Sequence, residues 1–294
     1  MNIFFIYNPK SGKGKIKEYL HDIIDAFSKA NHTLCIYATQ SANDAIEVVK
    51  KLKASQYDMI VCSGGDGTIA QVAYGLYQSK EKIAVGYIPT GSTNDFAKTM
   101  GISMDILSAV NNIIEGKIIQ IDEGLFNDQI FIYVAAFGIF SDVAYQTDQQ
   151  LKNSLGYLAY VLQGIKSLQE IKAYTMNIEA DRIQLEGEFI YGMISNSYFV
   201  GGSDLLLYQN VELDDGLLDV VFVEFPKNII QLQEIVHAIL TKKPHQNIHI
   251  FKTANLKITC NQKVLWTLDG ECGGSHDHVV IQNLKKQVAI VVKQ

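Results

Sequence analysis

The sequence predicts an α/β fold: a doubly wound α/β domain built on a parallel sheet, followed by a second domain rich in antiparallel strands. Short apolar runs alternate with segments of helical periodicity through the first third of the chain, which is typical of a parallel sheet covered by helices. From about Ile118 onward, strand-like runs become frequent and hairpin dipeptides join them. With 294 residues, 48% of them apolar, the chain can fill two modest cores.

Four buried strands and three helices are expected in the first domain. The strands are the apolar runs Ile3–Tyr7, Leu34–Tyr37, Met59–Cys62 and Ile83–Ile88. The helices have apolar positions at helical spacing and cover Ile16–Phe27, Ser41–Leu52 and about Ile69–Tyr77. Ser41 followed by Asp44 favours a helix start at that point.

The second domain is expected to consist of hairpins and one long helix. Its strands are expected at Ile118–Phe126, Ile130–Ala135, Tyr174–Glu179, Ile183–Leu185, Phe189–Ser195 and Leu217–Phe225, with two or three more strand pairs after them. Turns are expected at Asn127-Asp128 and Ala180-Asp181. The helix is expected near Leu155–Ile171.

Composition excludes several classes of function. The formal net charge is −6 and no basic block occurs, which argues against nucleic acid as a partner. The four cysteines form no CxxC pair, as expected of reduced thiols in a cytoplasmic protein. The longest apolar stretch, Ile130–Phe140, is about half of what a membrane span needs. If the protein meets lipid, it is expected to do so transiently, from the surface.

Three polar loops follow the first, third and fourth predicted strands. They are Asn8-Pro9-Lys10-Ser11, Gly64-Gly65-Asp66-Gly67-Thr68 and Gly91-Ser92-Thr93-Asn94-Asp95. Because the carboxyl ends of parallel strands share one edge of a sheet, these loops are expected to lie together where ligands of such sheets bind. The loops at Asn8 and at Gly91 would each, if considered alone, be an ordinary structural loop more often than not.

The loop Gly64–Thr68 has the residue types of a phosphate cradle. Glycines allow backbone amides to approach a ligand, and the helix that follows attracts anions at its N-terminus. A carboxylate in such a place would repel phosphate unless a cation lies between them, so Asp66 indicates Mg²⁺. The alternative is a glycine turn in which Asp66 and Thr68 cap the next helix. Neither a Walker A pattern nor GxGxxG is present.

These motifs resemble those of the diacylglycerol kinase and sphingosine kinase superfamily, and related NAD kinases share the GGDG element. Besides the three loops, the resemblance covers Asn196 with Gly201-Gly202, the segment Leu213–Asp219 and the segment Leu268–Glu271. Ser92 stands where the family usually has Thr, which keeps the hydroxyl. The resemblance implies a nucleotide-binding α/β domain, residues 1–117 plus about 284–294, and a β-sandwich lipid domain, residues 118–283. It also implies that the chain returns to the first domain at its C-terminus.

The resemblance assigns roles to individual residues. Asp269 would be the catalytic base for a lipid hydroxyl, Glu271 would orient it or help to hold metal, and Asp66 with Asp95 would place Mg²⁺ on the phosphates of ATP. The alternative for Asp269 is a plain Asp-Gly hairpin turn. A second Mg²⁺ site is implied at Asp215 with the carbonyls of Glu212 and Leu217, and an exposed turn is its alternative.

The function implied is an ATP-dependent lipid kinase that makes phosphatidic acid from diacylglycerol. Two alternatives are a kinase for another lipid alcohol, such as a long-chain base or phosphatidylglycerol, and an inactive nucleotide- or lipid-responsive regulator. The resemblance is compatible with a homodimer and with a cytoplasmic enzyme peripheral to the inner face of the membrane. Candidates for lipid contact, chosen by hydrophobicity, are Tyr145, Leu155, Tyr157, Phe199 and Leu205–Leu207.

Overall fold

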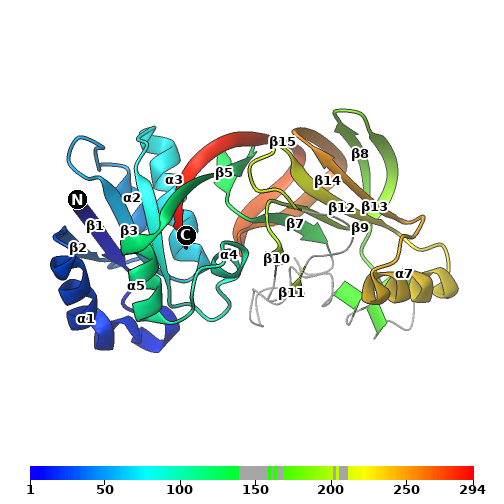
Figure 1. Ribbon diagram of the computed structural model, residues 1–294. Coiled ribbons are helices and arrows are strands. Elements are labelled where there is room, and N and C mark those ends of the chain that lie inside the picture. Colours follow the sequence, from blue (N-terminus) through cyan, green and yellow to red (C-terminus); the bar gives the residue numbers. More distant parts are fainter. Residues whose placement is uncertain (139–157, 160–161, 164–167, 201–202, 205–210) are drawn as a thin grey trace. The chain divides into compact units, whose positions relative to one another are not determined.

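A computed structural model describes residues 1–138, 158–159, 162–163, 168–200, 203–204 and 211–294 (Figure 1). The chain divides into two compact units. Unit 1 consists of Met1–Ile121 and Lys286–Gln294, and unit 2 consists of Asp122–Lys285. The chain leaves unit 1 along β5 (Lys117–Phe126) and returns to it along β15 (Glu271–Val292).

Unit 1 is a doubly wound α/β domain. Its elements before β5 are β1 (Asn2–Tyr7), η1 (Ser11–Gly14), α1 (Ile16–Lys29), β2 (Thr33–Ala38), α2 (Asp44–Val49), β3 (Met59–Gly64), α3 (Asp66–Ser79), β4 (Ala84–Pro89), α4 (Asp95–Thr99) and α5 (Ile106–Glu115). The strands pair in parallel in the order β2-β1-β3-β4, and Ile290 of β15 lies parallel to Val85 beyond β4. Strands β3 and β4 are buried along their whole length, as expected of a parallel sheet covered on both faces.

The helices of unit 1 pack in two pairs. Helix α1 contacts α5, and α2 contacts α3. The strand order reverses its direction between β1 and β3, which makes the carboxyl ends of these two strands the topological switch point where such sheets bind ligands.

The sequence missed two helices of unit 1 and misjudged the start of a third. Helix α5 has a clear signal, because the Asp105 carboxylate accepts a hydrogen bond from the Ser108 amide (2.9 Å) and apolar residues follow at helical spacing. Helix α4 is only five residues long, too short for a periodic pattern. Helix α2 begins at Asp44 rather than Ser41, after Asn43 in a left-handed conformation.

Unit 2 is a β-sandwich with one long described helix. Its elements are β6 (Gln129–Phe131), β7 (Val134–Gly138), η3 (Leu168–Glu170), β8 (Tyr174–Ala180), β9 (Gln184–Ser195), β10 (Phe199–Val200), β11 (Ser203–Asp204), β12 (Leu218–Glu224), α7 (Ile229–Thr241), β13 (Ile248–Thr253) and β14 (Asn255–Leu268). Strands pair in the order β13-β12-β9-β7-β14-β15, and β8 pairs with both β9 and β14. Aromatic side chains fill the core, with Trp266 against Phe126 and Phe137.

The strand predictions for unit 2 hold with two differences. The two runs Ile183–Leu185 and Phe189–Ser195 form the single strand β9, and the run Ile130–Ala135 is broken between β6 and β7. Helix α7 was missed altogether. Most of the predicted helix Leu155–Ile171 lies outside the described residues; residues 158–159 and 162–163 are helical. In the described parts of the chain, no helix is long and apolar enough to cross a membrane.

Candidate functional site

The three glycine-containing loops of unit 1 meet at the carboxyl edge of its sheet. The amide of Asn8 donates to the Ser63 carbonyl (2.9 Å), and the amide of Thr90 donates to the Gly64 carbonyl (2.8 Å). The Asn94 side chain closes its own loop, since it accepts from the Gly91 amide (2.9 Å) and donates to the Gly91 carbonyl (3.0 Å). Residues far apart in sequence are therefore brought to one edge.

Glycine is required at this edge because the loops approach each other closely. A Cβ atom on Gly91 would lie 2.5 Å from the Cα of Gly65, and one on Gly12 would lie 2.0 Å from the Thr90 carbonyl oxygen. Gly12 also has a φ of +54°, in the left-handed region that favours glycine. Side chains are thus excluded from Gly12 and Gly91, and a Cβ on Gly65 would be tight at 3.2 Å from the Cα of Gly91.

A hollow of about 390 Å³ opens beside these loops. Its lining includes Gly12, Lys15, Gly91, Thr93, Asn94 and Lys98. Two lysines provide positive charge, and Met104 with Ile106 adds an apolar wall that the sequence analysis did not anticipate. Positive charge and backbone amides beside an apolar wall suit an anionic ligand with a flat apolar part, such as a nucleotide.

Asp66 links two of the loops. Its carboxylate is buried and accepts hydrogen bonds from the amides of Asp95 and Phe96, both 3.1 Å, at the start of α4. Burial raises the pKa of Asp66 to about 6, against the opposing effect of those amides. Asp66 was expected, as an alternative to metal binding, to cap the helix that follows its own loop. That helix, α3, contains Asp66 and has no side-chain cap at its N-cap residue, Gly65. Asp66 instead caps the start of α4.

The carboxylate of Asp95 is also buried and lies near that of Asp66. It accepts a hydrogen bond from the ammonium group of Lys98 (3.2 Å), and its charge contributes to the raised pKa of Asp66. Mg²⁺ in phosphate-transfer sites is held by one or two carboxylates together with the phosphates. Asp66 and Asp95 fit that donor set.

Asp269 is both a hairpin turn residue and a fixed, buried carboxylate. Asp269 and Gly270 form the two-residue loop between β14 and β15, and both have positive φ, as a type I′ turn requires. The carboxylate accepts hydrogen bonds from three successive amides, Ile132 (2.8 Å), Tyr133 (3.0 Å) and Val134 (3.0 Å). These bonds explain why the chain breaks its strand between β6 and β7. The hairpin turn and a fixed carboxylate therefore occur together at Asp269, and its role as a catalytic base stays a prediction.

Glu123 lies close to Asp269 and was missed by the sequence analysis. It is fully buried on β5, and neither carboxylate oxygen has a hydrogen-bond partner among the described residues. Burial, and secondarily the charge of Asp269, raises the pKa of Glu123 well above its ordinary value. Glu271, which was expected to orient Asp269, begins β15 with an exposed side chain.

Glu123→Gln is expected to change how stability depends on pH. The raised pKa means that folded protein keeps a proton that the unfolded chain releases, so stability falls as pH rises above about 4.5. Glutamine cannot titrate. The melting temperature of the variant minus that of wild type should therefore increase as pH rises from about 5 to about 8. Circular dichroism melts over that range test this; parallel pH curves for the two proteins would refute it.

Asp122, also missed, ties the segment Leu213–Asp219 to β5. Its carboxylate accepts from the Gly216 amide (2.7 Å) and the Asn283 side chain (3.2 Å), and its carbonyl accepts from the Asn196 side chain (2.9 Å). The available signal was the pair Asp122-Glu123 inside a run that otherwise reads as a buried strand. Such a charged pair indicates a polar site rather than a core position.

Asp215 has a cation supplied by the chain itself. The ammonium group of Lys252 on β13 lies 3.1 Å from its carboxylate and 3.8 Å from that of Asp219, and the Leu217 amide donates to its other oxygen (2.8 Å). Glu212 is exposed. Among described residues, no group of three or more His, Cys, Asp or Glu side chains is arranged to hold a metal. The Mg²⁺ site expected at Glu212, Asp215 and Leu217 stays a prediction.

Lys252→Met should destabilise the protein by about 1–3 kcal/mol, between the values typical of exposed and fully buried ion pairs. The reason is that Asp215 and Asp219 lose their shared ammonium partner. Thermal melts with and without Mg²⁺, in the absence of nucleotide, provide the measurement. If Mg²⁺ can also bind Asp215, it will restore part of the lost stability. A melting temperature equal to that of wild type would show that the ion pair contributes nothing.

Comparisons with known proteins identify the class of protein. Residues 2–126 match the family described as "Diacylglycerol kinase catalytic domain", and residues 134–290 match the "YegS C-terminal NAD kinase beta sandwich-like domain". A Bacillus subtilis protein named diacylglycerol kinase is 32% identical over 295 residues, covering 96% of this chain and 97% of the relative. One from Staphylococcus saprophyticus is 31% identical over 287 residues, covering 97% and 93%.

Solved structures agree in fold. A Bacillus anthracis crystal structure described as that of a diacylglycerol kinase has a TM-score of 0.77 at 24% identity, covering 99% of this chain and 97% of that one. A second structure from the same organism has a TM-score of 0.85 at 26% identity, covering 99% and 95%. The protein is a lipid kinase. It belongs to the family of the diacylglycerol kinase catalytic domain.

Proposed function

We propose that this lipid kinase transfers the γ-phosphate of Mg-ATP to the hydroxyl group of diacylglycerol, giving phosphatidic acid. The observation that carries the proposal is the full-length similarity, at about a third identity, to relatives named diacylglycerol kinase. The arrangement of polar groups in each unit supports it. Unit 1 offers an anion site beside two buried carboxylates, and unit 2 offers a fixed carboxylate for an acceptor hydroxyl.

The phosphates of ATP lie against the glycine loops at Gly12, Gly65 and Gly91, where the absence of side chains leaves room, and are bound by the ammonium groups of Lys15 and Lys98. Asp66 and Asp95 would hold Mg²⁺, and the metal would offset the negative charge that develops during phosphoryl transfer. Lysines and amides alone would bind phosphate without activating it. The two carboxylates therefore distinguish this site from one that only binds anions.

Asp269 accepts the proton of the acceptor hydroxyl. As the hydroxyl oxygen bonds to the γ-phosphorus, the bond from phosphorus to the β-γ bridging oxygen breaks, ADP leaves with that electron pair, and the proton passes to the Asp269 carboxylate. A carboxylate is a weak base, which suits a loose transition state in which the hydroxyl keeps its proton until late. The three amides that bind Asp269 keep it in one orientation.

The enzyme meets its lipid by transient contact of a cytoplasmic protein with the inner face of the membrane. None of the described helices is long and apolar enough to span a bilayer.

An acceptor panel tests the proposed function. Purified protein with Mg-ATP is offered diacylglycerol, a long-chain base, phosphatidylglycerol and soluble NAD in separate mixed-micelle reactions, and products are identified by mass. Phosphatidic acid as the dominant product supports the proposal. A phosphorylated long-chain base or phosphatidylglycerol instead would change the acceptor. Binding of Mg-ATP without any product would favour a regulator.

A further inference from the structure

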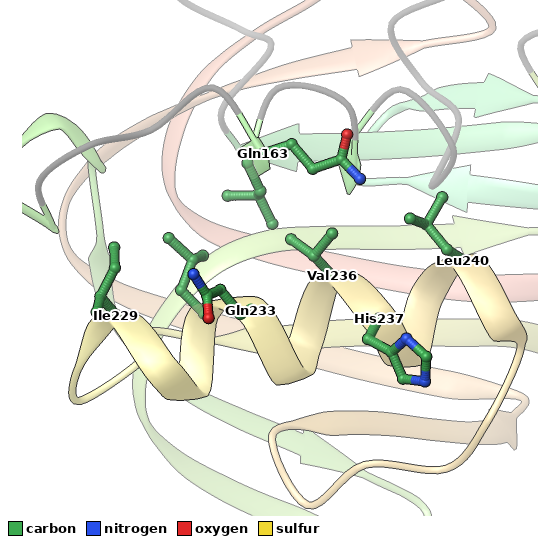
Figure 2. A pocket seen from close by; sticks show the side chains of 8 residues that line it. Gln163, Ile229, Gln233, Val236, His237 and Leu240 are labelled. Carbon is green, nitrogen blue, oxygen red and sulfur yellow. The ribbon is translucent and has the colours of Figure 1, made fainter.

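We propose that the groove along α7 in unit 2 binds an ester-linked acyl chain of the acceptor lipid. This inference rests on the proposed function, and it identifies the part of unit 2 that recognises the acceptor. The groove has a volume of about 340 Å³, and its apolar lining is Leu162, Ile229, Leu232, Val236 and Leu240 (Figure 2). Four of these five residues belong to α7.

Helix α7 carries apolar side chains on more than its buried face. Ile235 and Ile239 are buried, as expected of a helix packed on a sheet. Ile230 and Leu240, however, are 64% and 54% exposed, and Ile229 is 39% exposed. An apolar outer face costs solubility and is typical of a surface that contacts lipid or another apolar partner.

The length of the groove suits a chain-like ligand. Its lining on α7 runs from Ile229 to Leu240, and this part of the helix is about 16 Å long at 1.5 Å per residue. A groove of this length with an apolar wall has room for an extended hydrocarbon chain.

Charge at both ends of α7 favours a lipid surface as the source of that chain. Lys227 precedes the helix, Lys242 and Lys243 follow it, and all three are exposed. The acidic residue of the helix, Glu234, lies 3.7 Å from the imidazole of His245. Lysines around an apolar surface attract anionic headgroups while the apolar residues meet acyl chains.

Polar side chains within the groove indicate an ester rather than a bare alkyl chain. Gln233 and His237, one turn apart on α7, line it together with Gln163 (Figure 2). The amide of glutamine and the N–H of imidazole are hydrogen-bond donors, and an ester carbonyl is an acceptor only. Diacylglycerol presents two such carbonyls beside its acyl chains, whereas a long-chain base has none.

Leu240→Glu tests the groove, and Val280→Glu on β15 is the matched control because Val280 is 44% exposed and does not line it. Both sites are exposed, so folding should survive either change. With long-chain diacylglycerol, Leu240→Glu should raise KM about tenfold, whereas KM for Mg-ATP and kcat with a short-chain, water-soluble diacylglycerol should stay near wild type. The control should behave as wild type. Equal effects of the two variants, or an unchanged KM, would overturn the proposal.

Two further measurements separate this inference from the proposed function. Binding of a fluorescent long-chain diacylglycerol, measured without ATP, should weaken about tenfold in Leu240→Glu even if no turnover is found with any acceptor. Sedimentation is measured on the same samples: loss of a dimer with unchanged lipid binding would make the groove a subunit interface and refute the lipid site.

An ether-linked analogue, which lacks the carbonyls, tests the ester preference. Wild type should bind the ester about fivefold better than the ether, as expected for one or two hydrogen bonds. The double variant Gln233→Leu with His237→Phe should bind both equally. Equal affinity of wild type for the two lipids would remove the ester from the proposal.

Discussion

Asp269→Asn is expected to lower kcat about a thousandfold, because loss of a general base typically costs a hundredfold to ten-thousandfold. The variant keeps a side chain of the same shape, but its amide can no longer take up the acceptor proton. It also places an NH₂ group among the backbone amides that now donate to Asp269, so the melting temperature should fall as well. Initial rates with diacylglycerol and Mg-ATP, together with thermal melts, measure both effects.

Gly270→Ala is the matched control for Asp269→Asn. Gly270 has a φ of +84° in the same turn, so an alanine there strains the turn but leaves the carboxylate in place. The control should lose stability, by about 1 kcal/mol, and keep most of its activity at a temperature where it is folded. Similar losses of kcat in both variants would mean that Asp269 acts only through the turn, and the catalytic role would have to be abandoned.

Gly91→Ala should lower the affinity for Mg-ATP about a hundredfold, because displacement of a positioned group by about 1 Å can cost that much. The added methyl group would lie 2.5 Å from the Cα of Gly65 and 2.7 Å from the Asn94 side-chain oxygen. Neither the Gly65 backbone nor the hydrogen-bonded Asn94 side chain can move away easily. The loops that contain Gly65 and Gly91 must therefore move apart. Titration calorimetry with Mg-ATP gives the affinity.

Gly187→Ala controls for the general effect of adding a methyl group to a glycine. On β9 the new Cβ would meet only a Phe189 ring carbon at 3.9 Å, an ordinary contact. This variant should bind Mg-ATP as wild type does. Retained affinity in Gly91→Ala would show that the phosphates bind elsewhere on unit 1.

The strands and polar loops of unit 1 could be predicted because each depends on short-range sequence. Buried parallel strands read as continuous apolar runs, and the glycine loops directly follow them. The partners of the loop residues could not be predicted in the same way. Asp66 accepts from amides 29 and 30 residues further on, and nothing in either loop specifies which helix the carboxylate caps.

In unit 2, the sequence predicts the hairpin turn at Asp269 but not the residues that surround its carboxylate. Asp-Gly between two apolar runs predicts the hairpin, yet the amides that bind Asp269 are at least 135 residues away. Glu123 was overlooked because the strand signal of its neighbours outweighed the charge. Helix α7 was not predicted, because its apolar residues lie on more than one face and therefore give a weak helical period.

The lipid-contact candidates chosen by hydrophobicity had a similar weakness. Tyr145, Leu155, Tyr157 and Leu205–Leu207 lie outside the described residues, and Phe199 forms the short strand β10. Hydrophobicity alone does not separate a groove from a core. The distinguishing property is exposure on one face of a helix, which requires knowing what covers the other face.

Transfer of a labelled phosphate from Mg-ATP to diacylglycerol tests the proposed reaction and the role of Asp269 together. Protein is incubated with diacylglycerol micelles and Mg-ATP labelled at the γ-position, and the label is followed into extracted lipid for wild type, Asp269→Asn and Gly270→Ala. Labelled phosphatidic acid is expected from wild type and Gly270→Ala, and almost none from Asp269→Asn. Label that stays in the aqueous phase with wild type, while Mg-ATP binding is intact, would refute the proposed transfer to diacylglycerol.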